Sequence, residues 1–378
     1  SPNLWLQSVT HTGFAADGVT TAAEPTMTFG GTGMFNRAEW GDDIGVAPYN
    51  HYRITSIATG TGSQTLVTYS SAECNRTFTP TADHNPYRCF PQYFKPQIAA
   101  AGWSWFQKYV VTAVTERDLT GGSPDETWSY AYSTAGSSDT SLWFHDYTET
   151  VQLAYRSWSQ WRGYTTVVTT HGATSGQQTV STSLYYRGMN GDGLLSADKA
   201  SVLWGTRAVT LTDSQGTAVT DSYGLLGFLR EQTTQDGSTV LGSTIHVPAV
   251  TQTALRNAPA TGGQNIAATM VTEPGTRSRT WLPVSSTWRW TETQRTFDGY
   301  GLPTLVKDLG DTTVATDDTC TSTSYARSVT TTSYFVDLPA QEVTTDCAAT
   351  LTDASYLAGS QTLYDGSTTV GAAPTQGL

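Results

Sequence analysis

Charged side chains are scarce in this chain, and lysine is the scarcest of them. Only 14% of the 378 residues are Asp, Glu, Lys or Arg, and four of the 20 cationic residues are Lys. Long solvated helices normally carry many Glu, Lys and Arg residues, so very little helix is expected. The net charge is -12 and no basic stretch occurs, which removes the electrostatic basis for binding nucleic acid or an anionic membrane surface.

Other absences narrow the class of protein further. The sequence has no apolar run long enough to insert into a membrane, no signal peptide and no lipidation motif. GxxxxGK[ST], GxGxxG, HExxH and GxSxG patterns are also missing, so nucleotide-binding, zinc-protease and serine-hydrolase functions have no motif to support them. The chain starts abruptly and stops just past a Tyr-Asp-Gly, and we expect it to be a piece of a longer secreted polypeptide with its export signal upstream.

The four cysteines fall into two local pairs, Cys74 with Cys89 and Cys320 with Cys347. Neither pair is a CxxC motif, and the single histidine between the first two cysteines makes a poor zinc set. Two local disulfides are therefore predicted, with free buried thiols as the alternative. Disulfides imply an oxidising, extracellular compartment.

The abundant residues are those typical of β-structure. Aromatic residues make up 11% of the chain, with 12 Trp and 19 Tyr, and Thr, Ser and Gly are frequent. Strand-like runs separated by turns at intervals of about 10 residues predict an all-β fold with antiparallel pairing. The predicted strands are residues 4–12, 26–29, 52–58, 64–69, 109–117, 126–133, 180–186, 208–213, 218–223, 287–297, 302–308, 324–336 and 341–345.

A few stretches depart from this pattern. Residues 196–202 are predicted to form one helical turn, and residues 265–271 fit either a helix or a strand. Prolines interrupt residues 246–285, which are predicted to be a domain boundary or a long excursion. Residues 90–105 and 156–164 are rich in aromatic rings and are predicted to be irregular segments.

The most specific motif is RTFDGYGLPTLVKDLGD, residues 295–311. Asp298-Gly299 followed by Gly301 lies between two apolar runs and predicts a hairpin, because glycine accepts the positive φ of a tight turn. The stretch resembles one unit of the RHS/YD-repeat family, whose units carry a Tyr-Asp-x-x-Gly core. Phe297 stands at the Tyr position, and Asp298 and Gly301 stand at the Asp and Gly positions.

Tyr364-Asp365-Gly366 resembles a second, partial unit, and an insertion carrying Cys320 and Cys347 is expected between the two. The whole chain resembles the long RHS-repeat proteins of secreting, high-GC bacteria. The further stretches that carry this resemblance are RAEWGDDIGVAPYNHYRIT, YSSAECNRTF, RCFPQYF, WFQKYVVTAVTERD, YRSWSQWRGY and YYRGMNGDG.

The resemblance implies a fold and a division of the chain. Residues 1–285 would be a divergent β-rich lead-in, and residues 286–378 would be the repeat segment. The family is similar to the cocoon-forming components of bacterial toxin complexes and to the teneurin barrel. It implies an extended antiparallel sheet that spirals into a hollow shell around a C-terminal toxin or effector. The family's self-cleaving core and a toxin domain are both missing from this sequence.

One loop is a candidate calcium site. Asn190, Asp192 and Asp198 supply oxygen ligands, but positions 1 and 12 of the loop would be Gly188 and Lys199, which do not suit the ion. The alternative is an Asn-Gly and Asp-Gly turn with no metal. No other cofactor is expected.

Neighbouring carboxylates could in principle serve glycoside hydrolysis. Each candidate pair lies in a turn-like setting, where Asp normally caps the turn, so no catalytic residue is assigned. The pairs are Asp42 with Asp43, Glu116 with Asp118, Asp125 with Glu126 and Asp317 with Asp318.

Two tryptophan clusters, Trp103 with Trp105 and Trp158 with Trp161, could form a platform on which sugar rings stack. The alternative is that these rings fill the space behind a curved sheet. The leading hypothesis is therefore a structural, encapsulating piece of a secreted shell. Its partners would be the rest of the polypeptide, associated shell chains and an enclosed toxin. A module that binds cell-surface glycans is the alternative, and a carbohydrate-active enzyme is the third hypothesis.

Overall fold

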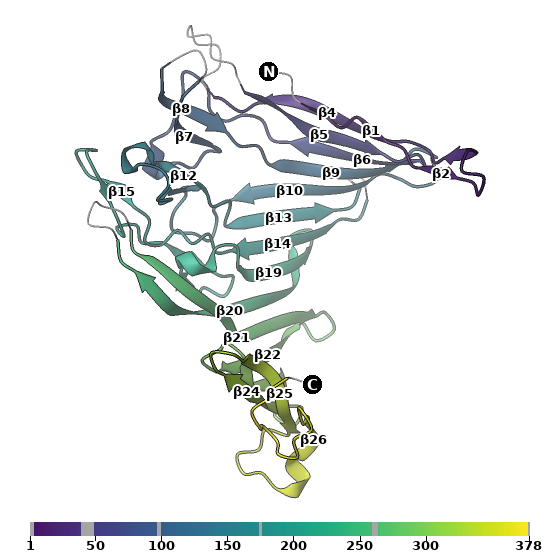
Figure 1. The fold of residues 1–378 in the computed structure, drawn as a ribbon, viewed down its shortest axis with the longest axis vertical. Helices are drawn as coiled ribbons and strands as arrows, with labels where there is room; N and C mark the ends of the chain where they lie inside the picture. Colours follow the sequence, from purple (N-terminus) through teal and green to yellow (C-terminus); the bar gives the residue numbers. More distant parts are fainter. Residues whose placement is uncertain (1–3, 39–48, 97–99, 174–175, 259–263, 377–378) are drawn as a thin grey trace. The chain divides into compact units, whose positions relative to one another are not determined.

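The computed structural model describes residues 4–38, 49–96, 100–173, 176–258 and 264–376 (Figure 1). Within these ranges the chain forms β-strands joined by turns, with four short 3-10 turns and no α-helix. The predicted all-β class with very little helix is confirmed. The chain divides into two compact units. Unit 1 comprises Ser1–Phe228, Gln235–Ser238 and Asn257–Asn265, and unit 2 comprises Leu229–Thr234, Thr239–Arg256 and Ile266–Leu378.

The main sheet of unit 1 is antiparallel, and most neighbouring strands follow one another along the chain (Figure 1). The strands predicted at 52–58 and 64–69 pair as a hairpin, and those predicted at 109–117 and 126–133 pair with one another. In sheet order the strands are β1 (Ser8–Val9), β4 (Met27–Phe35), β5 (Asn50–Ala58), β6 (Ser63–Tyr69), β9 (Val111–Asp118), β10 (Glu126–Ser133), β13 (Thr166–His171) and β14 (Thr179–Tyr185).

The first predicted strand, residues 4–12, is wrong over most of its length. Only β1 pairs with β4 there. The indole N–H of Trp5 donates to the carbonyl oxygen of Phe29, and its ring occupies the space beside Gly31. A side chain therefore contacts the backbone of β4 where a strand would have been expected to pair with it.

Unit 1 also carries small two-stranded sheets, and they correct three predictions. The described parts of the aromatic-rich segments 90–105 and 156–164 are mostly strands and not irregular, with Phe90 opposite Phe106 and Trp161 opposite Trp143. Residues 196–201 form the turn of a hairpin, Val202 begins its second strand, and no helix forms there. The pairs are β2 (Thr12–Phe14) with β3 (Thr21–Ala23), β7 (Cys89–Phe94) with β8 (Gly102–Gln107), β11 (Trp143–His145) with β12 (Trp158–Trp161), β15 (Leu194–Leu195) with β16 (Val202–Leu203), and β17 (Thr210–Thr212) with β18 (Ala218–Thr220).

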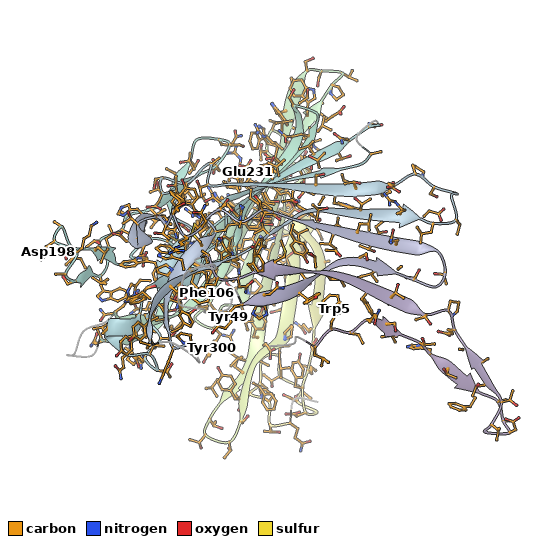
Figure 2. The ribbon with its side chains drawn as sticks, turned by 90° about the horizontal axis from the view of Figure 1, so that it is seen from above. Trp5, Tyr49, Phe106, Asp198, Glu231 and Tyr300 are labelled. Atoms are coloured by element: carbon orange, nitrogen blue, oxygen red, sulfur yellow. A yellow bond between two sulfur atoms is a disulfide. The ribbon has the colours of Figure 1, made fainter. Side chains whose placement is uncertain are left out.

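Aromatic rings and the first disulfide dominate the interior of unit 1. Leu142, Trp143 and Trp158 are buried together. At the surface, the exposed ring of Tyr49 lies beside Phe106 (Figure 2), and the two ring centroids are 6.4 Å apart. Both predicted disulfides are formed, one in each unit, and no cysteine is free.

The sheet of unit 2 is a meander in which each strand pairs with the next. Residues 246–285, predicted as a boundary or an excursion, lie mostly in its two longest strands. Residues 324–336 are not one strand, because the chain turns at 330–333. The strands are β19 (Leu229–Asp236), β20 (Thr239–Arg256), β21 (Ile266–Leu282), β22 (Thr287–Phe297), β23 (Pro303–Asp311), β24 (Thr319–Val329), β25 (Tyr334–Thr345) and β26 (Tyr356–Gln361).

The same irregularity occurs in two strand pairs of unit 2. Between β22 and β23 the register shifts after Thr296, and Phe297 then lies opposite Pro303. Between β24 and β25 the register shifts after Ser324, and Tyr325 then lies opposite Pro339. Proline has no amide hydrogen to donate to a ladder, so a bulge is where a sheet accommodates it. An aromatic residue facing a bulged proline is thus a repeated feature of this sheet.

Candidate functional site

The most specific sequence motif folds as the predicted hairpin between β22 and β23. Oδ1 of Asp298 accepts the amide hydrogens of Tyr300 and Leu302, and the amide of Gly301 donates to the carbonyl of Asp298. Gly301 has φ 78°, and a Cβ there would collide with the sulfur of Met270 on β21. The positive φ of the turn therefore requires glycine at 301.

Arg327 on β24 links this turn to the next strands. Its guanidinium forms an ion pair with Oδ2 of Asp298, and its Nε donates to the carbonyl of Val336 at 2.9 Å. The rings of Tyr300 and Tyr325 lie 4.8 and 5.0 Å from the guanidinium carbon. Cation–π contact and the ion pair together fix the turn against the sheet.

The pKa of Asp298 agrees with a role in fixing the turn. Desolvation raises its pKa, but the amide of Leu302, the guanidinium of Arg327 and the amide of Tyr300 outweigh it, so the pKa lies below its ordinary value. A carboxylate stabilised in its charged form by local donors acts as a turn anchor. A general acid would need the opposite shift.

The second motif is built differently. Asp365 has φ 55°, and its Oδ2 accepts the amide hydrogen of Gln376 at 2.9 Å and the hydroxyl of Thr375 at 3.0 Å. The hydroxyl of Tyr364 donates to the carbonyl of Pro339. Asp365 therefore fixes the chain after β26, whereas Asp298 closes its own tight turn.

Unit 1 contains a buried ionic cluster that the sequence did not reveal. Arg207 donates to Oδ2 of Asp139 at 2.7 Å. Its Nε lies 3.2 Å from Oδ2 of Asp192, close enough for an ion pair but without the geometry of a hydrogen bond. Arg187 is fully buried and donates to the hydroxyl of Ser137 at 2.9 Å.

Asp192 and His145 are neighbours in this cluster, since Oδ1 of Asp192 accepts the amide hydrogen of His145 at 2.9 Å. Burial raises the pKa of Asp192 to about 6, although the guanidinium of Arg207 opposes the shift. Burial lowers the pKa of His145 to about 4, and its Nδ1 has no hydrogen-bond partner among the described residues. The carboxyl is thus the stronger proton acceptor of the two, the reverse of their usual order.

The calcium candidates are held by separate protein groups. The side-chain oxygen of Asn190 accepts the amide of Val209. Asp198 accepts a hydrogen bond from the hydroxyl of Ser196 in the exposed β15–β16 turn (Figure 2). Asp192 faces Arg207. Within the described ranges, no three His, Cys, Asp or Glu side chains are grouped so that they could hold a metal ion.

The carboxylates of the predicted pairs lie in different settings: Asp118 and Asp317 accept backbone amide hydrogens in turns, whereas Glu116 and Glu126 lie within strands β9 and β10. Asp118 accepts amide hydrogens from Thr120, Gly122 and Ser123. Asp125 pairs with Arg117 at 2.7 Å. The pair Asp42 and Asp43 lies outside the described residues.

The structure brings together a different carboxylate pair, Glu116 and Glu126. They lie directly opposite one another on β9 and β10 and line a surface hollow of about 300 Å³. His171 approaches Glu126 at 2.7 Å and stacks on Trp128. Both glutamates are exposed to solvent, whereas a glycosidase acid is normally kept in an apolar environment. Strand register, which the sequence did not provide, would have been needed to find this pair.

The four tryptophans do not share one surface. Trp158 is 4% exposed, Trp161 packs against the same buried cluster, and Trp105 packs against the first disulfide. Only Trp103 is largely exposed, at 49%. It lies beside Tyr93, whose other neighbour is the exposed ring of Tyr155, stacked at 4.1 Å. Neither tyrosine was predicted from the sequence.

Comparison with known proteins assigns no family. No protein-family model matches the chain, and a search of curated proteins finds no match. Among the described residues, no helix has the length and apolar character needed to cross a membrane.

Proposed function

We propose that this chain is a structural piece of a secreted RHS-repeat protein whose sheet forms part of a β-shell around a cargo or effector domain. The observation that carries the proposal is the repeated bulge of unit 2, where Phe297 faces Pro303 and Tyr325 faces Pro339. Copies of one strand pair can be added side by side to extend a sheet, and repeat proteins build large surfaces in this way.

The contacts of the repeat support the same role. Asp298, Gly301 and Arg327 hold a turn in place through an ion pair, a left-handed glycine and ring contacts. These contacts connect the turn to the neighbouring strand β24. The function of the shell would be containment, in which laterally paired strands separate a cargo from the surrounding solution.

The disulfides support an extracellular location for this shell. Both join residues that are close in sequence, and such bonds persist in oxidising compartments. The partners in the proposal are the remainder of the polypeptide, associated shell chains and a C-terminal toxin. The resemblance of residues 295–311 to a YD unit supports this choice of partners.

Limited proteolysis of the native polypeptide that contains this chain tests the proposal. We expect its cargo region to resist added protease until the β-region is denatured. The matched control is the same cargo region expressed alone, which should be cut rapidly. Equal cleavage rates for the two would contradict containment.

A glycan-binding module is the second candidate, favoured by the exposed ring of Trp103 beside Tyr93. Aromatic faces of this kind stack on pyranose rings. Tryptophan fluorescence titrated with a panel of polysaccharides, using Trp103→Ala as the control, tests it. A response that the substitution abolishes would favour binding, and flat titrations across the panel would remove it.

A further inference from the structure

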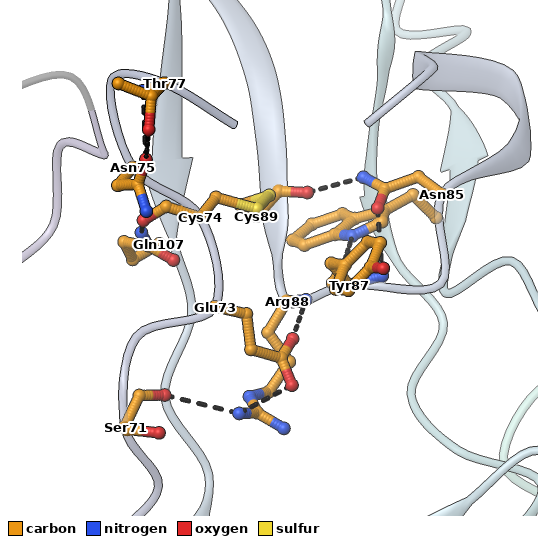
Figure 3. Close-up of a disulfide and its surroundings, with 11 residues drawn as sticks. Ser71, Glu73, Cys74, Asn75, Thr77, Asn85, Tyr87, Arg88, Cys89 and Gln107 are labelled. Atoms are coloured by element: carbon orange, nitrogen blue, oxygen red, sulfur yellow. Dashed lines mark hydrogen bonds and ion pairs between the residues drawn. A yellow bond between two sulfur atoms is a disulfide. The ribbon is translucent and has the colours of Figure 1, made fainter. Parts of the chain in front are cut away.

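The two disulfides lie in very different surroundings. Cys74 and Cys89 are 3% and 0% exposed and pack against Ala38. Figure 3 shows the side chain of Asn85 donating to the carbonyl of Cys89, and Gln107 donating to the carbonyl of Cys74. A reductant must displace this packing before it can reach either sulfur.

The disulfide of unit 2 is partly exposed and joins two strand ends. Cys320 is the second residue of β24, and Cys347 lies just beyond the end of β25. Both cysteines are partly accessible to solvent. A reductant must reach a sulfur atom to attack a disulfide, so Cys320–Cys347 should be reduced before Cys74–Cys89.

Cys347 also has an unfavourable backbone conformation. Its φ is 61°, in the left-handed region that non-glycine residues rarely adopt. Such a conformation persists only where its surroundings enforce it, and the covalent link to Cys320 is such a constraint. Breaking the link would allow residue 347 to return to an ordinary conformation.

Residue 347 lies near the start of the connection from β25 to β26. That connection, residues 346–355, leads into β26, whose residues are all exposed. In the part of the chain that the structure describes, β26 pairs with β25 alone, over the register from Gln341 with Gln361 to Thr345 with Tyr356. An edge strand with so little burial depends on its backbone ladder and on the anchoring of its connection.

We propose that Cys320–Cys347 is a redox latch for β26. A dithiol reductant opens it while Cys74–Cys89 stays closed, and β26 then loosens from β25. One thiolate attacks a sulfur of the bond and forms a mixed disulfide. The second thiol of the reductant then attacks the mixed disulfide and releases the protein sulfur. The reductant ends as a cyclic disulfide, and the protein has gained two electrons and two protons as two thiols. This inference is independent of the proposed containment function.

The test is graded reduction of the folded chain with dithiothreitol, followed by alkylation and peptide mass spectrometry. We expect Cys320 and Cys347 to be alkylated at least tenfold faster than Cys74 and Cys89. Hydrogen exchange on the partly reduced protein should show at least a tenfold loss of protection in β26, with β20 and β21 unchanged. Equal reduction rates, or unchanged protection in β26, would overturn the latch.

A matched pair of variants tests the backbone step separately. Cys320→Ser with Cys347→Ser removes the bond and keeps a Cβ at residue 347, whereas Cys320→Ser with Cys347→Gly removes both. Glycine tolerates the left-handed conformation, so the glycine variant should keep several-fold more protection in β26 than the serine variant. Equal protection in the two would overturn the role of residue 347.

Discussion

The hydroxyl of Tyr325 donates to the carbonyl oxygen of Pro303 at 2.9 Å. Tyr364 makes the same bond to Pro339 at 3.0 Å. In each case the tyrosine hydroxyl donates to the carbonyl of a proline that lies beside a bulge in an earlier strand. Phe297, at the register position equivalent to Tyr325, has no hydroxyl and cannot make this bond.

The first prediction concerns these two bonds. Tyr325→Phe should lower the free energy of unfolding by about 1 kcal/mol, because it removes a partly buried hydrogen bond. Tyr364→Phe should cost less, since its bond is exposed to water. Urea denaturation followed by circular dichroism measures both. A larger loss at Tyr364 would contradict this interpretation.

The second prediction concerns pH. The folded state disfavours protonation of His145, so the stability it contributes is full above pH 6.5 and is lost as the pH falls towards about 4. The folded state favours protonation of Asp192, so its contribution is full below pH 3.8 and is lost as the pH rises through about 6. The two trends oppose each other between pH 4 and 6.

Removing one member of this pair should expose the trend of the other. In Asp192→Asn only the trend of His145 remains, so the stability of unit 1 should rise by about 3 kcal/mol at most between pH 4 and 6.5. His145→Gln should give the opposite slope. Chemical denaturation at half-unit pH steps measures both slopes, and parallel curves for all three proteins would contradict the assignment.

The third prediction separates the tryptophans. Trp158→Ala should destabilise unit 1 by about 3–5 kcal/mol, because it empties a buried site and removes the indole bond to Gly193. Trp103→Ala should change stability far less, because its ring is half exposed. Thermal unfolding of the two variants side by side tests this, and similar losses would show that Trp103 is also a packing residue.

The fourth prediction concerns the facing glutamates. Like charges directly opposite on a strand pair repel, so Glu116→Gln should raise stability by about 0.5 kcal/mol at low salt. Salt should reduce the gain through screening. The control is Asp337→Asn, an exposed carboxylate outside this pair. A loss of stability on substituting Glu116 would contradict repulsion between Glu116 and Glu126.

Local patterns predicted much of the fold. The strand at 287–297 matches β22 at both ends, because alternating residues and a following Asp-Gly turn define it. The turn at 330–333 was missed because it has neither glycine nor proline. The hydroxyl of Thr330 accepts the amide of Ser333 and holds it closed. The prolines of β20 and β21 suggested breaks, but each lies where the register shifts.

The candidate sites were less predictable because they depend on long-range contacts. Arg207 meets Asp139 from 68 residues away, and no local pattern indicates this pairing. The facing of Glu116 and Glu126 depends on the register between β9 and β10. Asp298 and Gly301 were found because a tight turn places its own chemical demands within a few residues.

The most direct test of the central claim is a cryo-electron microscopy map of the native protein. The containment account predicts that the large antiparallel sheet borders an enclosed cavity filled by density for a cargo or effector domain. A map in which both faces of that sheet are open to solvent would contradict it.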